Sequence, residues 1–129
     1  MTPGQDTSLP SDEKLSAIVN LTNQILTSAI NQRASDIHIE PKEDKAHVRF
    51  RIDGDLRDAY LIQPETRKGL ILRLKVLANM NIAETRRPQD GAMEVILDKK
   101  KIKMRLTNNN LKRNKYTRNV YYISHQPRR

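Results

Sequence analysis

The sequence predicts an α+β domain in which two main helices pack on an antiparallel sheet of about five or six strands. Two segments repeat apolar residues at the spacing of an amphipathic helix. Several shorter segments alternate polar and apolar residues as half-buried strands do, and the connections between them are mostly too short for parallel crossovers. With 129 residues the chain is long enough for one hydrophobic core.

The first helix is expected to run from Ser11 to about Gln32. Ser11 offers a hydroxyl N-cap, and the two acidic residues that follow it suit the positive end of the helix dipole. The apolar stripe of this helix consists of Leu15, Ile18, Val19, Thr22, Ile25, Leu26 and Ala29. The segment before Ser11 contains two prolines and a glycine, which predicts a flexible leader over 1–10.

A change of period after this helix predicts three strands. The segments 36–40 and 47–52 both alternate polar and apolar residues. Asp53-Gly54 follows and predicts a tight hairpin turn, because both residue types tolerate positive φ. The segment 56–62 then forms the returning strand.

The second helix is expected from Glu65 to about Asn79. Its buried stripe consists of Leu70, Ile71, Leu74, Leu77 and Ala78, and its outward charges are Arg67, Lys68, Arg73 and Lys75. The following segment, 82–91, predicts a loop that is broken by a proline and turned by Asp90-Gly91.

Two further strands, 93–97 and 102–106, predict a second hairpin whose turn is the basic run 99–101. Beyond Leu106 the alternation decays. The sequence therefore predicts an α/β domain over 11–106 and a basic tail over 107–129 that is either disordered or contains one strand, near 120–123.

The formal charge of +9 is concentrated in the C-terminal part of the chain. From Asp98 to the end there are eleven basic residues and one acidic residue, so the first 97 residues are close to neutral. A basic tail on a near-neutral domain predicts weak, non-specific attraction to polyanions. The absence of cysteine excludes disulfides and cysteine-based metal sites. No apolar run approaches the roughly 20 residues of a membrane span, and the N-terminus carries no secretory signal pattern.

Four strings resemble the N-terminal half of the type II secretion system protein E and type IV pilus assembly ATPase family. They are ASDIHIEP at 34–41, VRFRIDG at 48–54, RLKVLANMNIAE at 73–84 and RRPQDG at 86–91, and they stand in register within 34–106. The resemblance implies a PAS-like domain that precedes the motor domain.

The resemblance also implies how such a domain works. The family's members are cytoplasmic homo-hexamers that hydrolyse ATP with Mg²⁺, and this domain contacts neighbouring subunits and closes over ATP bound by the motor. The inner-membrane platform would be an indirect partner, so any membrane association would be peripheral. The chain contains no GxxxxGK[ST] sequence. We therefore expect it not to hydrolyse ATP alone, and expect ATP and Mg²⁺ to be held only by a motor domain absent from this sequence.

The resemblance assigns one candidate phosphate contact. Family members have a strand that ends in an arginine reaching nucleotide phosphates, and the matching residue here is Arg105. A planar guanidinium can bind phosphate oxygens bidentately. Arg86 and Arg87 are candidates for a subunit or nucleotide interface, although a solvated loop charge is the simpler interpretation. From Asn108 onward the sequence does not match the family pattern.

Other polar residues have simpler interpretations. His38 and Glu40 share one strand face, but His38, His47 and His125 provide too few converging ligands for a metal site. Asp36 stands where a strand starts, and the aspartates of Asp53-Gly54 and Asp90-Gly91 stand at expected turns. Aspartate commonly serves structurally at such positions.

Two alternatives stay open from the residues alone. The first is a free-standing or truncated relative that acts as a binding module, with nucleic acid as a partner of the tail, where basic residues interleave with Tyr116, Tyr121 and Tyr122. We do not expect specific nucleic-acid recognition, because the chain has no recognisable nucleic-acid-binding motif. The second is a PAS-like module that binds a small ligand in an apolar cavity.

Overall fold

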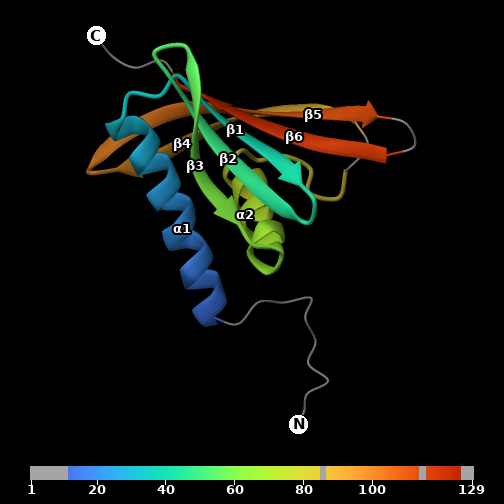
Figure 1. Cartoon of the computed structure of the whole chain (residues 1–129). Helices are drawn as coiled ribbons and strands as arrows, with labels where there is room; N and C mark the ends of the chain where they lie inside the picture. The colour runs from blue at the N-terminus through green and yellow to red at the C-terminus, as the bar shows by residue number, and fades with distance from the viewer. Residues whose placement is uncertain (1–11, 85–86, 114–115, 126–129) are drawn as a thin grey trace.

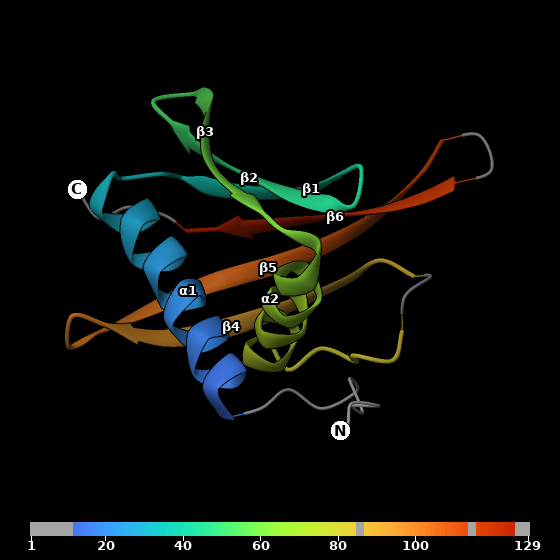
Figure 2. The ribbon, with the colours of Figure 1, turned by 60° about the horizontal axis from the view of Figure 1, so that its bottom comes forward.

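The computed structural model describes residues 12–84, 87–113 and 116–125; for 110–113 and 116–118 it describes the backbone alone. The elements are α1 (Asp12–Asn31), β1 (Asp36–Lys42), β2 (Lys45–Ile52), β3 (Asp55–Ile62), α2 (Pro64–Leu77), β4 (Gln89–Leu97), β5 (Lys100–Arg113) and β6 (Tyr116–Ser124). The strands form one antiparallel sheet in the order β3-β2-β1-β6-β5-β4 (Figure 2). The predicted α+β class is therefore confirmed.

Both helices lie on the same face of the sheet (Figure 1). The core fills the space between them and the strands, and Leu26 of α1, Leu74 of α2, Phe50 of β2 and Leu106 of β5 are each at most 1% exposed. No helix of the described ranges covers the opposite face. The sheet thus has an apolar inner face and a polar outer face, as the alternating patterns of the first strands indicate.

The two helices approach closely where α2 carries a glycine. A Cβ built on Gly69 would lie 2.2 Å from Cδ1 of Ile18 in α1. Glycine inside a helix costs about 1 kcal/mol relative to alanine. This glycine lies where α1 crosses α2, and a side chain at this position would have to displace the end of the Ile18 side chain.

The turn between β2 and β3 forms as predicted. Asp53 and Gly54 have φ values of 53° and 86°, which is the left-handed region that a two-residue hairpin turn uses. The turn between β4 and β5 is displaced from its predicted place at 99–101. Leu97 pairs with Lys100, so the turn residues are Asp98 and Lys99, which have φ values of 52° and 64°. Aspartate tolerates this region better than most residues do.

The Asp90-Gly91 dipeptide does not form the predicted turn. Both residues lie in β4, paired with Thr107 and Leu106. Gly91 does not adopt positive φ. A glycine is needed at this position because the inner face of β4 has no space for a side chain here. A Cβ at this position would lie 2.3 Å from the backbone oxygen of Ala78 at the end of α2. The glycine therefore permits contact between the end of α2 and β4.

Residues 107–113 and 116–124 belong to the sheet. The prediction that β5 ends near Leu106 is wrong, because the strand continues to Arg113. β6 then lies between β1 and β5 and contributes Val120, Tyr121 and Ile123 to the buried residues. On β5 the inner face carries Asn108, which is completely buried, and neither of its amide atoms has a hydrogen-bond partner in the described structure. A polar residue on the inner face is what breaks the apolar alternation at this point.

One predicted surface charge is buried. Lys75 was expected to point outward from α2, but its residue is only 5% exposed. Its ammonium lies over the ring of Tyr121, 5.7 Å from the ring centroid. The other three charges expected on the outward side of α2, Arg67, Lys68 and Arg73, are exposed or half-buried.

Candidate functional site

The outer face of the sheet arranges its polar side chains in rows across neighbouring strands. In the row that contains Arg105, this residue is opposite Ser124 of β6, Ser124 is opposite Asp36 of β1, and Asp36 is opposite Arg51 of β2. Side chains directly opposite on antiparallel strands lie close enough to interact. The pairing of β6 with both β1 and β5 therefore places Arg105 on the same continuous surface as the polar residues of β1 and β2.

Arg105 projects from the outer face of β5, and its side chain is 59% exposed. Its Nη2 donates a hydrogen bond to Oδ1 of Asp90 on β4, at 3.1 Å. Exposed ion pairs of this kind contribute about 0–1 kcal/mol, because water screens them and two side chains must be ordered. The guanidinium is therefore accessible, and a stronger anion can displace the carboxylate.

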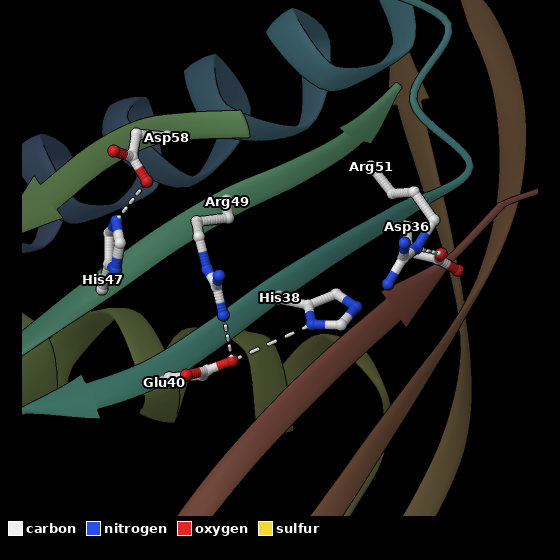
Figure 3. Close-up of polar contacts among 7 residues, drawn as sticks. All are labelled: Asp36, His38, Glu40, His47, Arg49, Arg51 and Asp58. Carbon is white, nitrogen blue, oxygen red and sulfur yellow. Dashed lines mark hydrogen bonds and ion pairs between the residues drawn. The ribbon is translucent and has the colours of Figure 1, made fainter. Parts of the chain in front are cut away.

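Two further arginines of the outer face, Arg49 and Arg51, are paired with carboxylates of β1 (Figure 3) and are less exposed than Arg105. Arg49 of β2 donates to Oε1 of Glu40 on β1, and both side chains are at least half-buried. Arg51 donates through Nε to Oδ2 of Asp36 at 3.1 Å and through Nη1 to the backbone oxygen of Gly54 at 2.9 Å. These contacts tie β2 and its turn to β1, so Arg49 and Arg51 act as cross-strand links.

The histidines of this face are also engaged in local contacts. His47 Nε2 lies 2.8 Å from Oδ1 of Asp58 on β3 (Figure 3). His38 stacks edge-on against Tyr122, with ring centroids 4.6 Å apart, and its Nδ1 is 4.0 Å from Oε1 of Glu40. Within the described part of the chain, no group of three or more His, Cys, Asp or Glu residues is arranged to hold a metal ion.

The surroundings of His38 resist its protonation. Burial lowers the pKa of His38 below its ordinary value of 6.5, and the positive charge of Arg51 lowers it further. Asp36 raises this pKa and Arg49 lowers it, and Glu40 also raises it, but the net direction is downward. The folded protein thus favours neutral His38, whereas the unfolded chain takes up a proton at about pH 6.5.

We expect the stability of the protein to fall when the pH is lowered through 6.5. Below this pH the unfolded chain binds more protons than the folded one, so acid favours unfolding until the pH reaches the lower folded-state pKa of His38. Urea midpoints measured between pH 7.5 and 5.5 will show the slope. His38→Gln should reduce this slope, and the burial-lowered pKa of His125 accounts for a part that remains. An unchanged slope in His38→Gln would contradict this account.

The other predicted site residues lie apart from Arg105 in the loop before β4. Arg87 is exposed, and its backbone N–H donates to Oε1 of Glu84 at 3.0 Å. Arg86 lies outside the described residues, as do the side chains of the basic residues in 110–118 on which nucleic-acid binding by the tail would depend. Neither α1 nor α2, the helices of the described ranges, has the length and hydropathy that spanning a membrane would require.

Comparison with known proteins places the chain in a family. The family described as type II/IV secretion system protein matches residues 11–111, from the start of α1 into β5. Type IV pilus assembly ATPase TfpB of Acinetobacter baylyi is 48% identical over 77 residues, which are 60% of this chain and 13% of that protein. Type II secretion system protein E of Klebsiella pneumoniae is 41% identical over 107 residues, which are 81% of this chain and 21% of that protein.

A solved structure has the same fold. The X-ray structure of the Legionella pneumophila ATPase DotB superimposes with a TM-score of 0.58 at 15% identity, over 97% of this chain and 31% of that one. At this identity the likeness concerns the fold alone. The chain spans about a fifth or less of the curated relatives named above. Because the family match includes most of the chain, this protein belongs to the type II/IV secretion system protein family. It corresponds to an N-terminal domain of the members of this family.

Proposed function

We propose that this chain is the domain that precedes the motor in a type II secretion or type IV pilus assembly ATPase. In this role it is non-catalytic. It contacts the motor domain and neighbouring subunits of a cytoplasmic homo-hexamer, and it closes over ATP bound by the motor. The family match and the names of the relatives support this proposal.

The observation that carries the proposal is the position of Arg105. It stands on the helix-free face of the sheet, it is 59% exposed, and its only ion pair among the described residues is the weak one to Asp90. A phosphate offers the guanidinium more negative charge than one carboxylate does, and it can accept two parallel hydrogen bonds. Exchange of Asp90 for phosphate would link closure of the domain to the presence of nucleotide.

The residues described here suit the phosphate part of ATP·Mg²⁺ and not its metal. Arg105 supplies an accessible phosphate ligand, whereas no described cluster of carboxylates or histidines is arranged to hold Mg²⁺. ATP supplies the γ-phosphate whose charge the guanidinium would neutralise. The metal and the remaining contacts to ATP would come from the motor domain.

Calorimetric titration of this chain into the motor domain of a cognate ATPase tests the proposal. We expect binding to strengthen when a non-hydrolysable ATP analogue is present. Arg105→Ala should weaken the nucleotide-dependent binding about ten-fold or more, since a hydrogen bond to a charged group contributes roughly 1.5–3 kcal/mol. Binding without nucleotide should stay unchanged in this variant.

Lys103→Ala is the matched control. Lys103 is exposed and lies two residues before Arg105 on the same strand, so both alternate onto the same face. Its loss removes a positive charge without removing the proposed phosphate ligand. If the two variants weakened binding equally, Arg105 would act only through its positive charge and not as a specific phosphate ligand. Absence of binding in every nucleotide state would refute the proposal.

A further inference from the structure

A groove of about 730 Å³ lies on the inner side of the sheet, between α2 and the ends of β1, β2 and β6. It is distinct from the outer face that carries Arg105. One wall includes a stripe of α2 spaced at four residues, Arg67, Ile71 and Lys75, and the opposite wall includes Ile39 and Tyr121. Ligand sites of proteins commonly have volumes of about 300–1,000 Å³, so the groove could hold a small organic molecule.

The groove contains a lysine whose charge is not matched by a close carboxylate. Lys75 lines the groove but is only 5% exposed, and its ammonium faces the ring of Tyr121 at 5.7 Å. None of the ion pairs formed within the described ranges includes it. Burial lowers the pKa of Lys75, and the negative charge of Glu84 offsets only part of this effect. An ammonium held over an aromatic face on a largely buried side chain is stabilised in part by the ring and gains more from an anion.

The rest of the lining adds further positive charge and an unpaired hydrogen-bond acceptor. Arg67 and Lys68 add positive charge from the first half of α2. Of the two carboxylates in the lining, Glu40 accepts a hydrogen bond from Arg49 and Glu43 lies in the exposed turn between β1 and β2. The balance of charge around the groove therefore favours a negative ligand.

Asn119 of β6 supplies the unpaired hydrogen-bond acceptor. It lines the groove, and its buried Oδ1 has no hydrogen-bond partner in the described structure. A buried acceptor without a partner carries a cost that a donor on a ligand would remove. Between these polar groups the surface is apolar, formed by Ile39, Ala46 and Ile71.

We propose that this groove binds a small organic anion, in which a phosphate monoester or a carboxylate is joined to a flat apolar body. The anionic group binds Lys75, with Arg67 and Lys68 at longer range. The flat body lies between Ile71 and Ile39, and a hydroxyl or amide N–H of the ligand donates to Asn119. This site is separate from the proposed contact between Arg105 and ATP, and it does not depend on a motor domain.

Four probes separate the contributions of charge and shape. 1-Naphthyl phosphate and 1-naphthoate carry both the flat body and the anion, 1-naphthol carries the body and a hydroxyl but no anion, and inorganic phosphate carries the anion alone. Each is titrated into the full chain and followed by calorimetry and by backbone amide shifts in two-dimensional NMR. We expect saturable binding of the two naphthyl anions, at least ten-fold tighter than either partial probe. The largest shifts should fall on Ile71, Lys75, Asn119 and Tyr121.

Lys75→Met tests the role of the charge, because methionine fills a similar volume without an ammonium. We expect it to weaken both naphthyl anions at least ten-fold and to leave 1-naphthol unchanged. Lys100→Met, in the exposed start of β5, is the matched control and should bind all probes as the unaltered chain does. The proposal would be overturned if Lys75→Met bound the naphthyl anions as tightly as the unaltered chain does. It would also be overturned by amide shifts confined to the outer face, or by a lack of saturable binding of either anion to the unaltered chain. The NMR result holds even if Lys75→Met fails to fold.

Discussion

A chain that ends at Arg113 will not fold into this domain, although it retains every string that marks the family. β6 lies between β1 and β5, so its removal leaves β3-β2-β1 and β5-β4 with no strand to join them. Both of its ladders are lost, from Asp36↔Ser124 on one side and from Arg105↔Ser124 on the other. The loss also removes three buried side chains, Val120, Tyr121 and Ile123.

The free energy lost with β6 exceeds the free energy of unfolding of a small domain. Burial of a large apolar side chain contributes roughly 1.5–3 kcal/mol, and whole domains are stable by only about 5–15 kcal/mol. Circular dichroism and urea unfolding should therefore show no cooperative transition for the shortened chain. A cooperative transition would show that β1 and β5 can pair directly and would contradict the central role of β6.

A pair of point variants checks the same conclusion in a folded protein. Ile123→Ala should cost about 2–5 kcal/mol, because Ile123 is 1% exposed on the inner face of β6. Ile96→Ala in β4 is the matched control, since Ile96 is 70% exposed, and it should change stability by less than about 0.5 kcal/mol.

Among the three glycines of the described ranges, Gly91 should be the one at which substitution by alanine destabilises the protein most. The new Cβ would lie 2.3 Å from the backbone oxygen of Ala78 and 3.2 Å from its Cβ, so α2 and β4 must move apart. Overpacking of this kind costs typically 1–3 kcal/mol, and we expect a loss of about 3 kcal/mol because the clash is with backbone. The urea midpoint of the full chain measures it.

The other glycines provide controls for this prediction. At Gly69 the nearest atom is the end of the Ile18 side chain, which can move, and alanine also gains about 1 kcal/mol of helix propensity. At Gly54 a Cβ meets nothing within 4 Å, and only its φ of 86° opposes alanine, at about 1–2 kcal/mol. Gly91→Ala should therefore destabilise the protein more than either variant. A smaller effect would show that α2 does not pack against β4 this closely.

The sequence predicts those parts of the fold in which local chemistry and burial agree. Helix α1 and strand β2 could be located because the apolar residues of each recur with one clear period, and β3 could be located as the strand that returns after the turn. The turn at Asp53-Gly54 could be located because its backbone conformation depends on the two residues themselves. Asp90-Gly91 has the same composition but lies in a strand, because it pairs with Thr107 and Leu106 of β5. Its glycine is required by the close approach of the Ala78 backbone, which is distant in the sequence.

Of the two candidate sites, one could be proposed from the sequence and the other could not. Arg105 was proposed by resemblance, and its exposure on the outer face agrees with that role without testing it. Its partner Asp90 could not be foreseen, because Asp90 was assigned to a turn. The groove could not be foreseen either, because Lys75 has the pattern of a surface charge and its burial depends on Tyr121, which lies 46 positions later in the chain.

By itself, the sequence determined the fold class, α1, the first hairpin and the family of this protein. The tertiary structure alone decided that residues 107–113 continue β5 and that β6 lies between β1 and β5. Asn108 and Asn109 have weak strand propensity and break the apolar alternation, yet β6 pairs with both of them and β4 pairs with Asn108. Hydrogen bonds between strands depend on which segments meet in space, so local composition cannot reveal them.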